Sequence, residues 1–164
     1  SQTGIEDAWY VVERREGIKR LIDNYKFHSA LEVSRHMAHV LDSRLPLLRD
    51  VVVTVAPTPP AHRRVRGFDH AERLGRQFAR SRSLPYDRLL RRLSADAQHL
   101  KSRSDRFTSA ARSIEAAKSA PESVLLIDDI LTTGATVAAC VKRLKESGAQ
   151  TVYVAIFARQ PYRK

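Results

Sequence analysis

The chain has 164 residues, of which 43% are hydrophobic, and it carries a formal net charge of +11. This length and composition predict one soluble globular domain and exclude a disordered or fibrous chain. The single cysteine, Cys140, excludes an internal disulfide and a zinc site of several thiolates. No apolar stretch reaches the roughly 20 residues of a membrane-spanning helix, so we expect a soluble, cytoplasmic protein.

The first part of the chain is predicted to be helical. Apolar residues recur at roughly helical spacing from Trp9 to Tyr25, and a second helix is predicted over residues 30–41. Pro46 lies just beyond the end of this second helix. We therefore expect a helical N-terminal part of about residues 6–45.

The hydrophobic period changes after residue 50, where strands and helices alternate. Strands are predicted at 51–55, 84–93, 124–127 and 151–157, and helices at 69–82 and 135–146. Residues 94–113 are polar and basic and are predicted to form a long mobile excursion, with a possible short helix at 103–111. This alternation predicts βαβ units, a mostly parallel sheet and a single α/β domain over residues 1–164.

The most informative motif is the thirteen-residue stretch from Val124 to Thr136. Asp128 and Asp129 stand at the carboxyl end of a buried strand, where ligands bind in open α/β sheets. A short loop then enters a helix, and its N–H groups and hydroxyls suit an anion. The loop residues are Thr132, Thr133, Gly134, Ala135 and Thr136.

Two adjacent carboxylates beside an anion loop could hold a sugar 5-phosphate, with the sugar hydroxyls on the acids and the phosphate in the loop. The alternative is structural: Asp129 or Thr133 caps the helix, and Gly134 serves the turn. The number of positions that fit one ligand favours the binding hypothesis.

This stretch resembles the phosphoribosyl pyrophosphate (PRPP) binding motif of type I phosphoribosyltransferases. The resemblance implies that Asp128 and Asp129 bind the ribose 2- and 3-hydroxyls, and that residues 132–136 bind the 5-phosphate. It also implies a mostly parallel five-stranded sheet flanked by helices, and Mg²⁺ as the cation that accompanies PRPP.

The positive charge is concentrated in residues 62–112, which contain 14 basic and 5 acidic side chains, a net +9. Such a block suits either nucleic acid or a polyphosphorylated small molecule. Guanidinium groups pair well with phosphate oxygens, so a pyrophosphate grip is predicted after the 51–55 strand. Its residues are Arg63, Arg64, Arg66 and Gly67. The alternative is a solvated basic turn.

The Pro-x-Pro, Arg and Arg-Gly-Phe pattern within residues 57–68 resembles the ComF family, which includes DNA-uptake competence proteins. The resemblance extends over roughly residues 16–158. It implies a mobile basic loop that closes over PRPP and contains Gln98, Arg103 and Arg106. Asp69 and His70 replace the Asn-Gln that is usual in the family, and the cysteine-rich zinc-binding segment of many members is missing.

Two functions remain open at this level. The first is Mg²⁺-dependent displacement of pyrophosphate from PRPP or another ribose 5-phosphate ligand, with no residue standing out as a general base and the acceptor unknown. The second is a non-catalytic protein with the same fold that binds single-stranded DNA during DNA uptake, with a DNA-uptake helicase as a further partner. No metal-ligating set is predicted, because His36 and His39 lack a third ligand.

Overall fold

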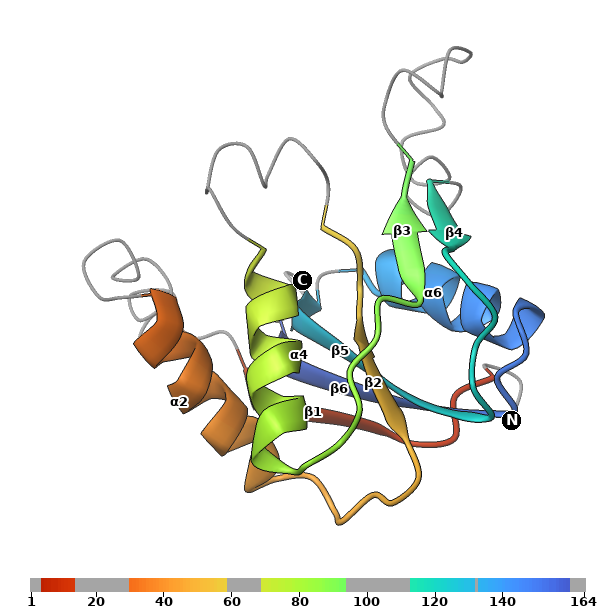
Figure 1. Ribbon diagram of the computed structural model, residues 1–164. Coiled ribbons are helices and arrows are strands. Elements are labelled where there is room, and N and C mark those ends of the chain that lie inside the picture. The colour runs from red at the N-terminus through yellow and green to blue at the C-terminus, as the bar shows by residue number, and fades with distance from the viewer. Residues whose placement is uncertain (1–3, 14–29, 59–68, 94–112, 132, 160–164) are drawn as a thin grey trace, which may run out of the picture.

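The computed structural model describes residues 4–13, 30–58, 69–93, 113–131 and 133–159 (Figure 1). Its main sheet has four parallel strands in the order β1-β6-β5-β2. These strands are β1 (Ala8–Glu13), β6 (Thr151–Arg159), β5 (Ser123–Leu131) and β2 (Val52–Val55). The predicted α/β fold with a parallel sheet flanked by helices is therefore confirmed.

The helix predicted from Trp9 is wrong for residues 8–13, which form strand β1. This strand pairs in parallel with β6, from Ala8 opposite Val154 to Glu13 opposite Arg159. Trp9 packs into the core on one face of the sheet, whereas Tyr10 is 54% exposed. The run of aromatic and β-branched residues thus follows a period of two. The rest of that predicted helix, residues 14–29, lies outside the described residues.

Two helices cover one face of the sheet: α2 (Ala30–Asp42) and α4 (His70–Ser81), both close to their predicted bounds (Figure 1). Arg82, the residue after α4, joins them by donating hydrogen bonds to the carbonyl oxygens of Asp42 (2.8 Å) and Leu45 (2.9 Å). A Cβ added at Gly75 of α4 would lie 2.4 Å from Val55 Cγ1. The absence of a side chain at this position therefore lets α4 pack directly on β2.

The opposite face is covered by α6 (Ala135–Glu146), which has its predicted bounds, and by a two-stranded antiparallel sheet of β3 (Leu90–Arg92) and β4 (Ile114–Ala116). Cys140 and Leu144 of α6 are completely buried in the core on this face, together with Leu126 of β5. The strand β4 was not predicted, because three residues show no clear period.

The main sheet has four strands rather than five in the described part of the chain. Tyr86 makes a single parallel bridge to Val53 of β2, with hydrogen bonds from Val53 N to Pro85 O (2.8 Å) and from Asp87 N to Val53 O (3.0 Å). The backbone N–H of Leu89 then donates to the Thr54 hydroxyl (3.2 Å) instead of to a backbone carbonyl. This side-chain bond ends the pairing along β2, so the segment does not continue as a fifth strand.

None of the helices in these ranges is both long and apolar enough to cross a membrane.

Candidate functional site

Two acidic side chains end the buried part of strand β5. Residues 124–127 are completely buried, whereas Asp128 and Asp129 are half-buried. The backbone N–H of Asp129 donates to Asp128 Oδ1 at 2.9 Å, which fixes the first carboxylate. β5 lies between two parallel neighbours, β6 and β2, and both acids lie in its carboxyl-terminal half, towards the edge of the sheet where loops form ligand sites. The predicted strand end at residue 127 is wrong, because β5 continues to Leu131 and still pairs with β6 there. The contact of both acids with ribose stays a prediction.

Asp128 lies in an unfavourable electrostatic environment. Burial raises its pKa well above the usual range, and the negative charges of Asp129 and then of Asp69 raise it further. The repulsion of Asp128 by Asp129 and Asp69 would be reduced by a ligand that donates hydrogen bonds to these carboxylates, or by a cation. A vicinal diol of a sugar supplies two such donors.

The loop after β5 enters α6 without a side-chain cap. Gly134 is the N-cap residue and has a φ of +79°, a left-handed conformation that favours glycine. A Cβ there would be 3.9 Å from Leu131 Cδ1, so the backbone angle, rather than space, requires glycine. The Thr133 hydroxyl accepts a hydrogen bond from Ala135 N at 3.4 Å.

Gly134 is therefore the N-cap residue and the structure does not support Asp129 as the cap of α6, whereas the Thr133 hydroxyl does bind the first N–H of the helix. Because Gly134 has no side chain, the first-turn N–H group of Thr136 keeps its capacity to bind an anion, whereas the N–H of Ala135 donates to the Thr133 hydroxyl. Thr132, also predicted to bind the 5-phosphate, lies outside the described residues.

Asp69 joins the two ends of the segment predicted to bind pyrophosphate. Its Oδ1 accepts hydrogen bonds from the Thr58 hydroxyl (2.9 Å) and from Glu72 N (3.1 Å), so it also caps α4. In the sequence, Asp69 stands out only as a departure from the family pattern. The predicted pyrophosphate residues, Arg63, Arg64, Arg66 and Gly67, lie outside the described residues.

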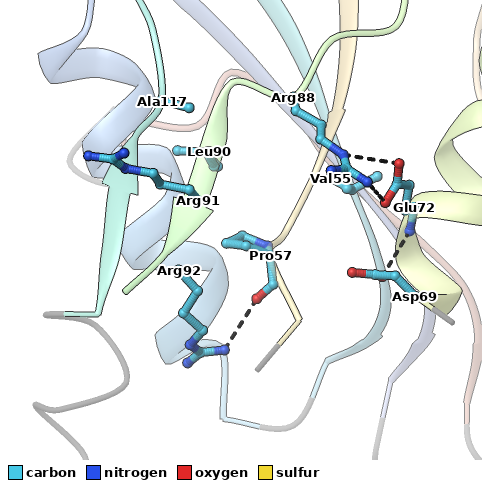
Figure 2. A pocket seen from close by; sticks show the side chains of 9 residues that line it. All are labelled: Val55, Pro57, Asp69, Glu72, Arg88, Leu90, Arg91, Arg92 and Ala117. Carbon is cyan, nitrogen blue, oxygen red and sulfur yellow. Dashed lines mark hydrogen bonds and ion pairs between the residues drawn. The ribbon is translucent and has the colours of Figure 1, made fainter. Parts of the chain in front are cut away.

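A pocket of about 280 Å³ opens beside the carboxyl end of β2 (Figure 2). On one side Arg88 is hydrogen-bonded to Glu72, with its Nε 3.0 Å from Glu72 Oε1. The pocket is lined by Val55, Pro57, Asp69, Glu72, Arg88, Leu90, Arg91, Arg92 and Ala117. The lining thus combines three arginines with two carboxylates, and two of the arginines form ion pairs, Arg88 with Glu72 and Arg91 with Glu115.

Arg92 is a candidate ligand-binding residue that sequence reasoning missed. Its Nε donates to Ser113 Oγ (3.0 Å) and its Nη1 to the carbonyl of Pro57 (3.2 Å), so it links β3, β4 and the end of β2 (Figure 2). Burial lowers the pKa of Arg92, while Cys140 and Asp128 act in the opposite direction. Arg92 thus lies close enough to Asp128 to act on it. The signal in the sequence that could have identified Arg92 is the pair Arg91-Arg92 at the end of a predicted strand.

Three other predicted residues, Gln98, Arg103 and Arg106, lie outside the described ranges. Within these ranges no group of three His, Cys, Asp or Glu side chains could hold a metal ion. Mg²⁺ usually binds through one or two carboxylates together with oxygens of a phosphate ligand. The carboxylates of Asp128 and Asp129 repel each other when both are ionised. They fit a site in which Mg²⁺ is shared with a phosphate ligand, and not a site built from protein side chains alone.

Comparison with known proteins identifies relatives with this architecture. Residues 70–164, more than half of the chain, match the phosphoribosyl transferase domain family. The chain is 31% identical over 138 residues to competence protein ComFC of Streptococcus pneumoniae (strain ATCC BAA-255 / R6), a match that covers 84% of this chain and 61% of the relative. This similarity supports the resemblance to ComF proteins.

Two solved structures share the fold. Glutamine PRPP amidotransferase from B. subtilis, in complex with ADP and GMP, is 21% identical with a TM-score of 0.54, and the match covers 77% of this chain and 26% of that one. A structure described as the allosteric regulatory enzyme of purine biosynthesis is 22% identical with a TM-score of 0.54, covering 79% of this chain and 25% of that one. The chain thus spans less than two thirds of each of these three relatives.

Proposed function

Because the chain belongs to the phosphoribosyl transferase domain family, we propose that it binds PRPP, or another ribose 5-phosphate, and transfers the phosphoribosyl group. The observation that carries the proposal is that Asp128 and Asp129 lie near the carboxyl end of β5, and that the loop after this strand enters α6 with a glycine at the N-cap. The carboxylates would accept hydrogen bonds from the ribose hydroxyls, and the loop N–H groups would donate to the 5-phosphate.

In the proposed reaction, the bond between the anomeric carbon and a pyrophosphate oxygen breaks, and its electron pair stays on that oxygen. The acceptor atom forms a new bond to the same carbon and loses its proton to water. Positive charge develops at the sugar ring in such displacements, and the carboxylates of Asp128 and Asp129 would stabilise it. Arg92 of the β2-side pocket, which interacts electrostatically with Asp128, would receive part of the pyrophosphate charge.

Bound Mg²⁺ would neutralise the phosphate oxygens of the ligand. The residues that would hold it are Asp128 and Asp129, since carboxylates are among the ligands that this cation prefers. A cation here would also offset the burial and the repulsion by Asp129 that raise the pKa of Asp128.

The test is a calorimetric titration with PRPP, with and without Mg²⁺, of the wild type and of Asp128→Asn and Asp129→Asn. Each substitution should weaken binding by at least about tenfold, because hydrogen bonds to charged groups contribute about 1.5–3 kcal/mol. Glu122→Gln is the matched control, since Glu122 is exposed at the opposite end of β5. Unmeasurable binding to the wild type, or equal binding by all four proteins, would contradict the proposal.

A second candidate is single-stranded DNA binding, which the similarity to a competence protein supports. Three of the described arginines of the basic segment favour it less, because they form ion pairs: Arg76 and Arg88 with Glu72, and Arg91 with Glu115. DNA binding predicts an affinity that falls steeply with salt and is independent of Asp128. An affinity for single-stranded DNA that is flat with salt would exclude this candidate.

A further inference from the structure

We propose that Glu72 and Tyr86 are positioning residues that give Arg88 two places beside the pocket next to β2. In the first place Arg88 is bound to Glu72, as in this structure. In the second, Arg88 turns into the pocket to bind an anion of the phosphate class, and the Tyr86 hydroxyl replaces it on Glu72. This exchange controls anion binding by the pocket, and it does not depend on the proposed phosphoribosyl transfer.

Glu72 occupies the part of Arg88 that a phosphate would bind. Its Oε1 accepts a hydrogen bond from Arg88 Nε at 3.0 Å, and its Oε2 accepts one from Arg88 Nη2. Figure 2 shows the Arg88 side chain turned towards Glu72 and away from the two arginines of β3. Guanidinium groups bind phosphate oxygens through the same pair of hydrogen bonds. Glu72 therefore competes with an anion for Arg88.

The backbone beside Arg88 is fixed, so the exchange requires only that a side chain turns. Before Arg88, Asp87 N donates to Val53 O at 3.0 Å. After it, Leu89 N donates to the Thr54 hydroxyl at 3.2 Å. The Arg88 side chain itself is 56% exposed and lines the pocket. Its rotation from the carboxylate into the pocket therefore disturbs little packing.

The Tyr86 hydroxyl is the donor that would replace Arg88. Its oxygen is buried and makes no hydrogen bond with the described residues. Burial, and then the negative charge of Glu72, raise the pKa of Tyr86 to about 12, so the hydroxyl keeps its proton at neutral pH. A buried hydroxyl without a partner is unfavourable. When Arg88 turns away, Oε2 of Glu72 loses its donor and can accept from this hydroxyl.

Arg76 holds Glu72 and Tyr86 together in both arrangements. Its Nε donates to Glu72 Oε1 at 2.9 Å, and its guanidinium carbon lies 4.5 Å from the centre of the Tyr86 ring. The carboxylate therefore keeps one cation when Arg88 leaves, and its charge stays compensated. Glu72 thus remains in place while its second partner changes from a guanidinium to a hydroxyl.

The test is a calorimetric titration with inorganic pyrophosphate of the wild type and of Tyr86→Phe, Glu72→Gln and Arg88→Gln. Tyr86→Phe should weaken binding by about tenfold, the effect of losing one hydrogen bond to a charged group. Its temperature of thermal unfolding should not fall, because the hydroxyl that it removes makes no hydrogen bond with the described residues. Glu72→Gln should strengthen binding roughly threefold, since a partly exposed ion pair no longer competes. Arg88→Gln should weaken binding.

Two controls and a double variant separate the exchange from general effects. Tyr153→Phe removes a tyrosine hydroxyl from β6, and Asp87→Asn removes an exposed carboxylate that does not line the pocket. Neither should change the affinity for pyrophosphate. In the Arg88→Gln protein, addition of Tyr86→Phe should have no further effect, because the carboxylate is then open to the hydroxyl with or without pyrophosphate.

The outcomes that overturn the proposal are distinct. If pyrophosphate does not bind the wild type, or binds Arg88→Gln equally well, Arg88 has no second place on an anion. If Tyr86→Phe leaves the affinity unchanged, or weakens it equally in the Arg88→Gln protein, the hydroxyl takes no part in an exchange. If Glu72→Gln weakens binding, the carboxylate orients Arg88 for the anion instead of competing with it. In each case PRPP binding that depends on Asp128 would stand.

Discussion

The two halves of strand β5 have opposite roles. Residues 124–127 are completely buried and packed from both faces of the sheet, whereas residues 128–131 are half-buried and begin with two acids. The first half contributes apolar burial to folding. The second half brings carboxylates together although burial and like charge raise the pKa of Asp128. The buried half of β5 therefore stabilises the fold, and the acidic half carries the electrostatic cost. Substitutions in the first half should change the free energy of unfolding, and substitutions in the second half should change ligand affinity.

The largest expected effect is on the buried half. Leu126→Ala should lower the free energy of unfolding by about 2–5 kcal/mol, because it leaves a cavity at a completely buried position. The affinity of the folded protein for PRPP should change little, since Leu126 lies in the core and precedes the two acids along β5. Urea denaturation and calorimetry measure the two quantities. A loss of affinity comparable with the loss of stability would show that the two halves are not separable.

A smaller effect of opposite sign is expected from Asp128→Asn without ligand. The pKa of Asp128 is raised in the folded state, so the folded protein binds a proton more readily than the unfolded chain. Its destabilising contribution is therefore complete above the folded pKa and disappears as the pH falls towards the unfolded value.

The variant should consequently unfold at a higher temperature than the wild type at neutral pH, with the difference shrinking in acid. Asparagine keeps the oxygen that accepts from Asp129 N, so the local hydrogen bond is retained. Thermal unfolding from pH 4 to pH 8 measures the difference. A variant that is less stable than the wild type at neutral pH would contradict the proposed cost of the acidic half.

The smallest effect is expected at the pocket beside β2. Burial would raise the pKa of Glu72, but hydrogen bonds from Arg88 and Arg76 outweigh burial and lower it. The carboxylate therefore stabilises the fold above its unfolded pKa, and this contribution is lost as the pH falls through the folded pKa. Glu72→Gln should cost less than about 1 kcal/mol at neutral pH, since the Arg88 side chain is 56% exposed.

Chemical denaturation at pH 7 and in acid tests this prediction, with convergence of wild type and variant expected in acid. The exposed pair of Asp87 with Lys118 provides a control, because Asp87→Asn should have a similarly small effect without touching the pocket. If Glu72→Gln lowered the free energy of unfolding by several kcal/mol, the pocket would, like the first half of β5, belong to the part of the protein that stabilises the fold.

The part of the fold that sequence predicts best is local. Strand β5 and helix α6 follow each other closely, and Gly134 marks the start of the helix, whereas the end of the apolar run at Asp128 marks the end of burial and not the end of the strand, which continues to Leu131. Helix α6 accordingly begins and ends where its period and Gly148 predict. The same order places the acids beside the anion loop, which is the half of the site that sequence reasoning found.

The remaining features depend on contacts between distant segments. Strand β1 pairs with β6, far along the chain, and its apolar residues fit either period until that partner is known. Arg92 and Asp69 acquire their places from Pro57, Ser113 and Thr58, which no local pattern connects. The sequence of the basic segment contains Arg91 and Arg92 side by side and does not indicate that Arg92 is the half-buried one that interacts with Asp128.

The pairing of β1 with β6 also constrains the order of folding. Among the described strands, β1 has β6 as its sole neighbour, so the strand nearest the beginning of the sequence has no sheet partner until the last has been synthesised. Contacts of such sequence separation slow folding, and Trp9, Tyr10 and Val11 would stay unpaired meanwhile. During synthesis, helix α2 and the β2–α4 unit can pack before β1 joins the sheet. The β1 edge should therefore be the last part of the sheet to form and the point at which an incomplete chain is most prone to associate.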